Sequence, residues 1–354
     1  MSAIPEFSHE RVLTSQGARS GLVITVALHS SALGPALGGC RMWAYPSWAD
    51  AQADALRLSA AMTLKNAAAG LDAGGGKSVI ALPMGEHVDP ERRRAALLDL
   101  GDLIEMLDGR YRTAEDVGTT EHDMVVVRER TEHVVGLPAE TGGAGEPAGA
   151  TALGVYSSVA PTLEAAFGSA EIEERSFVIA GLGQVGGRLA RMLAGHGARL
   201  FVTDIDERKQ ALAREIGAEW IAPTQALTTP ADVFVPAGLG GILTDAAIDA
   251  LPVRAVVGPA NNPLAERSGA ERLQQRGIVY APDFVVNAGG VIHLEGIANG
   301  LEWPAIAERL TGIADTLRDV FASAREGGTT PLAAAEAIAI ARIAAARSRQ
   351  AVAA

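Results

Sequence analysis

The run Ser176-Phe-Val-Ile-Ala180 leads directly into Gly181-Leu-Gly-Gln-Val-Gly-Gly187, a cluster of glycines that follows a short apolar segment. The apolar run is typical of a buried strand, and a helix is expected to follow over 188–195. A second apolar run, Arg199–Thr203, ends at Asp204. Strand, glycines, helix, strand and terminal acid, in this order, predict a Rossmann-type unit that binds a dinucleotide.

Each glycine of this fingerprint has a physical task. Gly181 makes the tight turn after the strand, and Gly183 lets the backbone approach a pyrophosphate. Gly186 lets the helix pack closely on the strand. The N-terminus of the helix offers free N–H groups and a positive dipole end to the phosphates. We therefore expect these three glycines to bind the cofactor.

Asp204 indicates which dinucleotide is bound. It lies 18 residues after Gly186, close to the spacing at which an acid contacts the adenosine ribose. Its carboxylate can accept hydrogen bonds from both ribose hydroxyls and would repel a 2′-phosphate, so NAD is expected rather than NADP. Arg208 and Lys209 lie nearby, and tolerance of NADP stays open.

The same alternation continues along this half of the chain. Strands are expected at 232–235, 255–257 and 279–281, and each is followed by a Gly-rich or Asn-rich cluster. Ligands gather where the strands of an open parallel sheet end. Asn261 and Asn287 are therefore candidate ligand contacts, with simple turn roles as the alternative.

The first half of the chain has its own glycine-rich stretch, Met62–Ile80, which contains Lys65 and Lys77. Helical periodicity from Ser47 to about 64 places Lys65 near a helix end, and a strand is expected at 78–82. A phosphate loop needs a strand before its glycines and a helix after them, whereas the order here is reversed. Bare backbone beside Lys77 is instead expected to admit a short anion or a carbonyl.

Two other segments of this half bear on function. The segment Gly34–Arg41 is expected to be a tight loop. Acids at 115 and 116 follow a short segment that begins at Tyr111. Asp116 gains a chemical role only if it folds toward Lys77.

Composition bounds the fold and the class of protein. The chain has 354 residues, 48% hydrophobic and 4% aromatic, with 40 glycines, which is typical of an α/β protein with two domains. The glycine- and proline-rich stretch near 140–149 separates the expected domains, a substrate-binding and catalytic domain at 1–140 and a nucleotide-binding domain at 141–329. The last helix, about 330–354, is expected to pack back on the first domain or to serve an oligomer interface.

The net charge and the cysteine content disfavour several kinds of partner and of protein. A net charge of −12 disfavours nucleic acid and anionic membranes as partners. No apolar run reaches the roughly 18 residues of a membrane span, and the N-terminus lacks a signal-peptide pattern. A single cysteine, Cys40, excludes an internal disulfide and fits a cytoplasmic protein. No metal site is expected.

Four separated motifs together resemble the glutamate/leucine/phenylalanine/valine dehydrogenase family. They are the stretch around the two lysines, Thr113–Thr119, the fingerprint at Gly181 and Asn287–Gly290. The resemblance covers nearly the whole chain and is greatest to the leucine, valine and phenylalanine dehydrogenases. It implies a two-domain α/β fold with the active site in a cleft between the domains, and reversible NAD-dependent deamination of a hydrophobic L-amino acid by a homo-oligomer.

The resemblance also implies residue roles. Lys65, with Asn261, would bind the substrate carboxylate. Lys77 would polarise the developing carbonyl or hold the attacking water, and Asp116 would carry protons to and from the amine and the water. The carbonyl of Gly39 would accept a hydrogen bond from the substrate amino group.

Cofactor and side-chain contacts follow from the same resemblance. Thr151 would hold the nicotinamide carboxamide, and Asn287 is a further cofactor contact. The side-chain pocket would be lined by Leu37, Ala114, Val291 and Leu294. These residues offer no cation for a glutamate side chain, so a hydrophobic substrate is expected. The leucine at 37 narrows the pocket and favours branched aliphatic substrates.

Several alternatives stay open. His293 and Glu295 differ from the leucine enzymes and resemble some phenylalanine enzymes, so an aromatic substrate is the main alternative. Cys40 stands where many relatives have threonine. A non-catalytic NAD-binding regulator would not need two lysines and Asp116 together. A dehydrogenase of 2-hydroxy acids, or an imine reductase, would not depend on ammonia.

Overall fold

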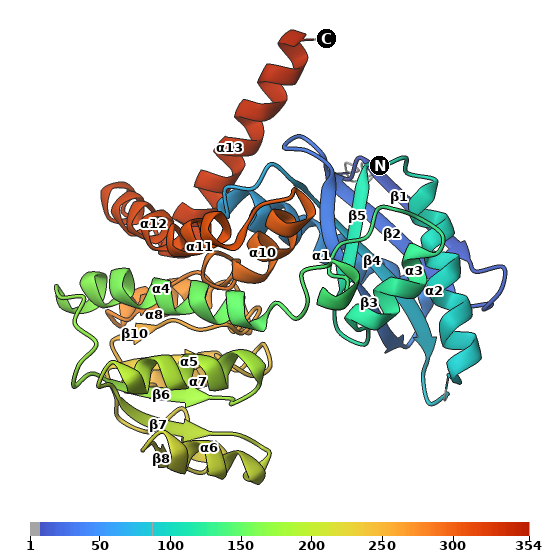
Figure 1. Cartoon of the computed structure of the whole chain (residues 1–354). Coiled ribbons are helices and arrows are strands. Elements are labelled where there is room, and N and C mark those ends of the chain that lie inside the picture. Colours follow the sequence, from blue (N-terminus) through green and yellow to red (C-terminus); the bar gives the residue numbers. More distant parts are fainter. Residues whose placement is uncertain (1–7, 87, 354) are drawn as a thin grey trace, which may run out of the picture. The chain divides into compact units, whose positions relative to one another are not determined.

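The computed structural model describes residues 8–86 and 88–353, and the chain forms two compact units (Figure 1). The first unit comprises the chain up to Glu146 with Ile297–Gly300 and the end of the chain from Ala339. The second comprises Pro147–Gly296 and Leu301–Ile338. Each unit has its own sheet and apolar core, which confirms the two-domain α/β fold class.

The first unit is built on a five-stranded mixed sheet in the order β1-β2-β4-β3-β5. Strand β2 is antiparallel to both β1 and β4, whereas β3 is parallel to β4 and β5. The strands are β1 Arg11–Gln16, β2 Val23–Ser30, β3 Ala36–Tyr45, β4 Gly74–Pro83 and β5 Tyr111–Glu115. Helix α1 (Trp48–Ala68) covers one face, and α2 (Pro90–Glu105) and α3 (Glu121–Arg128) cover the other.

Helix α1 confirms the sequence prediction of a helix that begins after Ser47. The Ser47 hydroxyl accepts a hydrogen bond from the Asp50 N–H at 3.2 Å, which caps the helix. Small residues at 51 and 55 let the helix lie close to Ala27 and Val79 of the sheet. The helix ends at Ala68, so Lys65 lies in its last turn.

The segment at Gly34–Arg41 is not the tight loop expected from the sequence, because β3 begins at Ala36. The reason lies in the two glycines of this strand. A Cβ atom at Gly38 would lie 1.8 Å from the Gly76 carbonyl oxygen, and one at Gly39 would lie 2.6 Å from the Glu115 carbonyl oxygen. The glycines therefore let β3 lie close to its neighbours, and they do not turn the chain.

The glycines at Gly74–Gly76 also belong to a strand, since β4 begins at Gly74 and not at Ser78. At the first glycine a Cβ atom would lie 2.0 Å from the Ser30 carbonyl oxygen. At the second it would lie 2.1 Å from the Thr63 backbone nitrogen, and at the third 2.6 Å from the Tyr111 ring. The protein's own atoms fill the space that the sequence suggested for a ligand.

The second unit contains a six-stranded parallel sheet in the order β11-β10-β9-β6-β7-β8. The strands are β6 Ser176–Ala180, β7 Arg199–Thr203, β8 Glu219–Trp220, β9 Val233–Pro236, β10 Ala255–Val256 and β11 Val279–Tyr280. The order of the strands reverses between β6 and β9, where an open parallel sheet forms its ligand crevice. The predicted Rossmann-type arrangement is confirmed.

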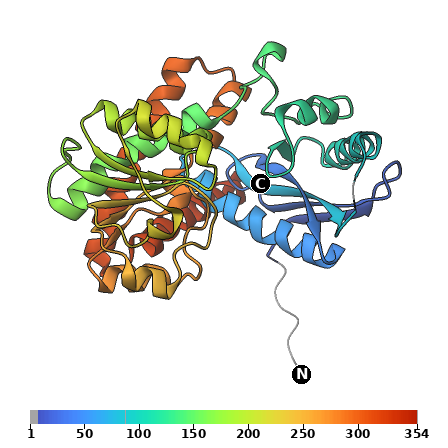
Figure 2. The same ribbon diagram turned by 90° about the horizontal axis from the view of Figure 1, so that it is seen from below.

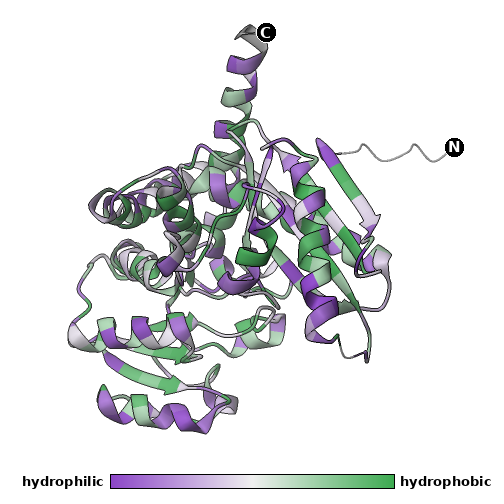
Figure 3. Cartoon of the chain, turned by 45° about the vertical axis from the view of Figure 1, so that its right-hand side comes forward, coloured by the Kyte–Doolittle hydropathy of each residue, from purple (hydrophilic) through white to green (hydrophobic). Residues whose placement is uncertain are grey.

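Helices lie on both faces of this sheet (Figure 2). Helix α5 (Gln184–Gly195) packs against β6 and β7, and α4 (Ala148–Phe167) packs against α5. On the opposite face, Val178 packs in one apolar cluster with Ile248 of α7 (Asp245–Ala250) and Leu273 of α8 (Gly269–Gln275). Strands β6, β7 and β9 are accordingly mostly apolar (Figure 3).

The remaining elements of the described chain are short turns and helices. They are η1 Ala139–Thr141, η2 Glu207–Lys209, α6 Gln210–Glu215, η3 Pro223–Gln225, α9 Asp283–Val286, α10 Gly289–Ala298, α11 Trp303–Thr311, α12 Ile313–Gly327 and α13 Pro331–Ala353. The end of the chain from Trp303 forms the three helices α11, α12 and α13. The end of α13 belongs to the first unit, where Arg342 donates hydrogen bonds to the Leu71 carbonyl at 2.6 Å and the Asp72 carboxylate at 3.0 Å.

Within residues 8–86 and 88–353, no single helix is long and apolar enough to cross a membrane. Only the segments Trp303–Gly327 and Pro331–Gln350 reach that length together, and they are bent by 108°. The N-terminal residues on which the sequence argument about export rests lie mostly outside the described part of the chain.

Candidate active site

An ion pair between Lys77 and Asp116 lies at the centre of the candidate site in the first unit. The Lys77 side chain is only 5% exposed, and its Nζ lies 2.9 Å from Asp116 Oδ2. Lys77 is on β4 and Asp116 directly follows β5, with β3 between them. The intervening position on β3 is Gly39, where a Cβ atom would lie 2.9 Å from the Asp116 Cβ. The absence of a side chain on β3 therefore makes room for the ion pair.

The backbone around Asp116 is held to β3 on both sides. The Asp116 N–H donates to the Thr119 hydroxyl at 2.9 Å, and that hydroxyl donates to the Cys40 carbonyl at 2.8 Å. The Met42 N–H donates to the Val117 carbonyl at 2.9 Å. These hydrogen bonds fix the direction in which the Asp116 side chain leaves the turn.

Arg41 is a second cation beside Asp116, and no motif in the sequence indicated it. Its Nε lies 3.2 Å from the same Oδ2 atom that pairs with Lys77. Burial alone would raise the pKa of Asp116, but the charges and hydrogen bonds of Lys77 and Arg41 outweigh it and hold that pKa below its usual range. Asp116 is therefore a carboxylate at neutral pH.

Lys65 lies on the helix that covers this face of the sheet. The neighbouring Asn66 donates hydrogen bonds to the Leu37 carbonyl at 3.2 Å and the Gly74 carbonyl at 2.6 Å. The last turn of α1 is thus fastened to the starts of β3 and β4. The Lys65 side chain is half-buried and shares a helix face with Met62, three residues earlier.

Two apolar residues lie on the same sheet face as the ion pair. Leu37 alternates with Gly39 along β3, and Ala114 on β5 lies opposite Gly39. Both side chains are buried, with 3% of each exposed. The first unit therefore contains six of the residues expected from the sequence: Leu37, Gly39, Lys65, Lys77, Ala114 and Asp116.

In the second unit, the three fingerprint glycines have different surroundings. Gly181 has a φ of +117°, and a Cβ atom there would lie 2.7 Å from the Ala237 carbonyl carbon. A Cβ atom at Gly186 would lie 2.1 Å from the Gly181 carbonyl oxygen. At Gly183 it would meet no atom within 4 Å. Only the second glycine faces open space, at the cap of α5, which fits the approach of a pyrophosphate.

The helix after the glycines starts earlier than the sequence suggested. It begins at Gln184 and not at Arg188, so Gly186 lies within its first turn. The first turn of a helix directs unpaired N–H groups outward. The earlier start brings these donors next to Gly183.

Asp204 directly follows β7 and braces the glycine turn. Its Oδ2 accepts a hydrogen bond from the Leu182 N–H at 2.7 Å, and its Oδ1 accepts one from the Asp206 N–H at 2.9 Å. Two large apolar side chains near the ends of the strands are almost fully exposed, Ile205 at 93% and Leu239 at 89%. No sequence motif indicated these two residues, although an apolar residue directly after the acid is a usable signal.

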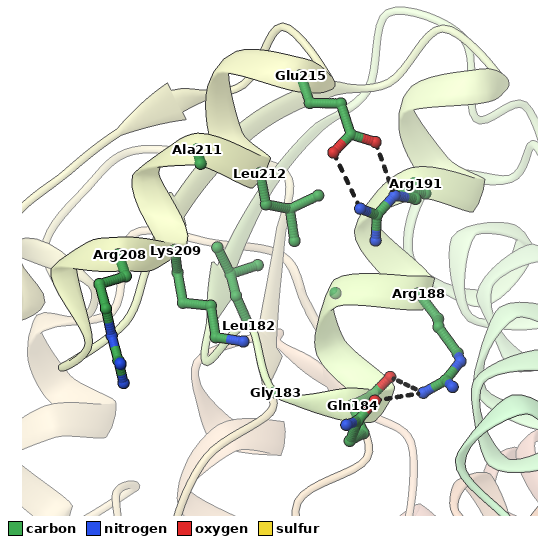
Figure 4. A pocket seen from close by; sticks show the side chains of 11 residues that line it. Leu182, Gly183, Gln184, Arg188, Arg191, Arg208, Lys209, Ala211, Leu212 and Glu215 are labelled. Atoms are coloured by element: carbon green, nitrogen blue, oxygen red, sulfur yellow. Dashed lines mark hydrogen bonds and ion pairs between the residues drawn. The ribbon is translucent and has the colours of Figure 1, made fainter.

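A cavity of about 460 Å³ opens beside the glycine turn, between α5 and α6 (Figure 4). Its lining includes four cationic side chains: Arg188, Arg191, Arg208 and Lys209. Arg191 pairs with Glu215 at 3.0 Å. Lys209 extends toward the turn at Leu182 and Gly183, and Arg208 points away from it. The cavity therefore adds positive charge next to the expected phosphate position.

Asn287 and Asn261 contact each other where β10 and β11 end. Asn287 Nδ2 donates hydrogen bonds to Asn261 Oδ1 at 2.9 Å and to the Pro259 carbonyl at 3.2 Å. Within the described chain, the buried Oδ1 of Asn287 accepts no hydrogen bond. Because an unsatisfied buried acceptor is costly, this oxygen fits a ligand that donates one.

Helices α4 and α10 bring the other expected residues of this unit together. Thr151 Oγ1 donates to the Pro147 carbonyl at 3.0 Å and lies 3.0 Å from the position of a Cβ at Gly290. Val291 and Leu294 lie one turn apart on α10, and Leu294 is 7% exposed. The second unit thus contains Thr151, Gly181, Gly183, Gly186, Asp204, Asn261, Asn287, Val291 and Leu294.

Comparison with known proteins identifies the family of this chain. The family model for the Glu/Leu/Phe/Val dehydrogenase dimerisation domain matches residues 9–133, and the Glutamate/Leucine/Phenylalanine/Valine dehydrogenase model matches residues 201–351. The chain belongs to this family. Like its members, the dehydrogenase is an oxidoreductase that acts on the CH–NH2 group of amino acids.

Individual relatives of the dehydrogenase match along nearly its whole length. A leucine dehydrogenase from Thermoactinomyces intermedius is 40% identical over 96% of this chain and 92% of its own length. A valine dehydrogenase from Streptomyces coelicolor is 42% identical over 96% of this chain and 94% of its own length. The crystal structure of L-tryptophan dehydrogenase from Nostoc punctiforme has a TM-score of 0.84 and 34% identity, covering 96% of this chain and 97% of that one.

Proposed function

We propose that this dehydrogenase catalyses the reversible NAD-dependent deamination of a branched-chain L-amino acid. The overall reaction converts the amino acid, NAD+ and water into the 2-oxo acid, NADH, ammonium and a proton. The buried Lys77–Asp116 ion pair carries the proposal, because it places a cation and a base within 2.9 Å of each other. The similarity to leucine and valine dehydrogenases supports the choice of substrate.

Within the pair, Asp116 would act as the base and Lys77 as the stabilising cation. Bound NAD would accept the hydride that leaves the α-carbon of the amino acid. Asp116, which is ionised, would take a proton from the substrate amino group and later from the attacking water. The Lys77 ammonium would stabilise the negative charge that develops on the oxygen during hydration of the imine.

Other residues of the first unit would orient the amino acid. Lys65 would bind the substrate carboxylate, together with Asn261 of the second unit. The Gly39 carbonyl would accept a hydrogen bond from the substrate amino group. Fixing the substrate at both of its charged ends positions the α-carbon for hydride transfer.

Residues of the second unit would bind the pyrophosphate, the ribose and the adenine of NAD. The open space at Gly183 and the start of α5 would receive the pyrophosphate. Asp204 would accept hydrogen bonds from the adenosine ribose, and its charge would disfavour NADP. The exposed Ile205 and Leu239 would pack against the adenine.

Two further residues of the second unit are proposed to bind the nicotinamide end of the cofactor. Thr151 and the unpaired Oδ1 of Asn287 would bind the nicotinamide carboxamide. An amide group can both donate to the buried oxygen and accept from a neighbouring donor.

The residues expected to contact the substrate side chain favour an aliphatic substrate. Leu37 and Ala114 in the first unit, and Val291 and Leu294 in the second, are all apolar. An aromatic amino acid is the second candidate, because the His293 ring contacts the Trp303 ring edge-on at 5.9 Å beside this segment of α10. The similarity to a tryptophan dehydrogenase points the same way.

The proposal extends to assembly and location. The first unit matches a domain described as a dimerisation domain, so we infer a homo-oligomer. A cytoplasmic location fits Cys40, whose thiol is buried and unpaired. Burial raises the pKa of this thiol to about 12, so it is a poor nucleophile.

A substrate panel tests the proposed function. NADH consumption is measured with 4-methyl-2-oxopentanoate, 3-methyl-2-oxobutanoate, phenylpyruvate and 2-oxoglutarate, each with and without ammonium, and again with NADPH. We expect ammonium-dependent turnover that is fastest with the two branched 2-oxo acids and NADH. Fastest turnover with phenylpyruvate would move the substrate to the aromatic class. NADH binding without turnover of any 2-oxo acid would contradict an enzymatic role.

A further inference from the structure

The ion pair at Asp116 is one part of a longer row of alternating charges. Beyond Asp116, the Arg41 guanidinium reaches a second acid, with Nη1 at 2.9 Å from Asp54 Oδ2. The Tyr45 hydroxyl donates to the same Asp54 oxygen at 2.7 Å. The row Lys77, Asp116, Arg41 and Asp54 thus connects β4, the end of β5, β3 and α1.

Burial makes this row different from a surface network. The exposed fractions of the side chains are 5% for Lys77, 27% for Asp116, 22% for Arg41 and 15% for Asp54. Ion pairs that are shielded from water are screened less than surface pairs. The charges along the row therefore act on each other more strongly than exposed pairs do.

Arg41 is held from both of its ends. Its Nε binds Asp116 and its Nη1 binds Asp54, so the planar guanidinium cannot rotate without losing one acid. Asp54 is held in turn by the Tyr45 hydroxyl at Oδ2 and by Arg57, whose Nη2 lies 2.7 Å from Oδ1. Tyr45 lies four residues along β3 from Arg41, on the same sheet face. A lysine could not make both contacts in this geometry.

The two cations engage the same oxygen of Asp116. Lys77 Nζ and Arg41 Nε both contact Oδ2. Among the described residues, Oδ1 accepts no hydrogen bond. One oxygen of the carboxylate is therefore anchored, and the other is available to a reacting proton.

We propose that Arg41 is a positioning residue for Asp116. Held by Asp54 and Tyr45, it fixes Oδ2 against Lys77, presents Oδ1 to the substrate and keeps the carboxylate ionised. This role rests on the proposed function, because it concerns the acid that carries protons in the deamination. Asp54 and Tyr45 act only through Arg41.

Substitutions in this row have different expected effects on Asp116. Arg41→Gln removes a positive charge and should raise the pKa of Asp116. Arg41→Lys keeps the charge but cannot bridge both acids, so it should leave that pKa low while it lowers turnover. Asp54→Asn removes the negative charge that pairs with Arg41 and leaves Arg41 less firmly held. It should therefore lower turnover without raising the pKa of Asp116.

The test measures Asp116 directly and turnover separately. The protein is labelled with [4-13C]aspartate, and the Asp116 signal is assigned by its absence in Asp116→Asn. We expect its titration in Arg41→Gln to move to higher pH by about half a unit or more, with kcat lowered about tenfold or more. NADH affinity and the melting temperature are measured on the same preparations, with Arg94→Gln as a control, because Arg94 pairs with Glu129 on the exposed surface.

The outcomes separate the two proposals. An Asp116 titration in Arg41→Gln that equals that of the wild type would overturn the positioning role, as would wild-type kcat in both Arg41 variants. If Arg41→Gln does not fold, Arg41→Lys and Asp54→Asn provide the test. Both should lose turnover without a rise in the pKa of Asp116. A wild-type enzyme that lacks ammonium-dependent turnover would contradict the proposed function, whereas the titration would still decide whether Arg41 controls Asp116.

Discussion

The two glycine-rich stretches look alike in sequence but serve opposite purposes in the fold. In Gly74–Gly76 the space that side chains would fill is occupied by the protein's own atoms. In the fingerprint of the second unit, Gly181 and Gly186 are packed in the same way, whereas Gly183 has no atom within 4 Å of an added Cβ. A glycine can therefore mark a close internal contact or an opening for a ligand, and only the surroundings distinguish the two.

The two units also use their glycines differently. The first unit uses its glycines to bring strands and α1 close together around a buried ion pair. The second unit keeps one glycine open beside a helix N-terminus. We interpret the first as a site for chemistry on the amino acid and the second as a site for the cofactor.

Gly75→Ala gives the largest expected effect on folding. The new Cβ would lie 2.1 Å from the backbone nitrogen of Thr63, and backbone atoms cannot move aside cheaply. We expect a loss of about 3 kcal/mol or more in the free energy of unfolding, or failure of the first unit to fold. Thermal and denaturant unfolding measure this loss.

Gly149→Ala is the matched control for that substitution. Its Cβ would meet no atom within 4 Å, and Gly149 lies in helix α4. We expect unchanged or slightly increased stability. Equal stability of the two variants would show that the glycines of β4 are not packing residues.

Gly183→Ala should affect ligand binding and leave the fold intact. The residue has a φ of −66°, which alanine adopts without strain, and its Cβ would meet no protein atom. We expect a melting temperature close to that of the wild type and a loss of NADH affinity of about tenfold or more, because the methyl group occupies the path of the pyrophosphate. Unchanged NADH affinity by fluorescence titration would mean that the cofactor phosphates lie elsewhere.

The sequence predicted some parts of this molecule well. Local patterns predicted the cap at Ser47, the position of Asp204 and five of the six strands of the second unit, because periodicity and turn chemistry depend on neighbouring residues. The two-residue strand β8 was not predicted. The fold class and the family were also correctly predicted.

Other parts depend on contacts between distant residues and could not be predicted. Strand β3 was missed because Gly38 and Gly39 weaken its apolar pattern, and their packing partners lie on other strands. The pairing of Arg41 with Asp116 spans 75 positions in the sequence. Such contacts are visible only once the sheet order is known. The roles assigned to individual site residues remain predictions.

Glu115→Gln should change the stability of the first unit by an amount that depends on pH. Glu115 precedes Asp116, and its buried Oε2 has no hydrogen-bond partner in the described chain. Burial, with the nearby charges of Glu121 and Glu146, raises the pKa of Glu115 to about 7. Because the folded-state pKa exceeds the ordinary value of 4.5, the wild type loses stability as pH rises from about 4.5 through about 7.

Glutamine at 115 does not ionise, so the variant should not lose stability in this way as the pH rises. We expect Glu115→Gln to be more stable than the wild type by about 1 to 3 kcal/mol at pH 8, with a smaller difference at pH 5. Denaturant unfolding at both pH values measures it. The exposed Glu219 of the second unit serves as the control, and Glu219→Gln should show no such dependence. A Glu115→Gln variant with a pH-independent difference would show that Glu115 is ionised throughout.

The division of labour between the two units is tested most directly by Asp116→Asn. Ammonium-dependent reduction of 4-methyl-2-oxopentanoate and NADH affinity are measured on one preparation of this variant and one of the wild type. We expect turnover to be abolished in the variant, because the proton carrier is lost, and the NADH dissociation constant to stay within about twofold of the wild type, because no cofactor contact is changed. Retained turnover, or a loss of NADH affinity, would contradict the assignment of catalysis to the first unit and of cofactor binding to the second.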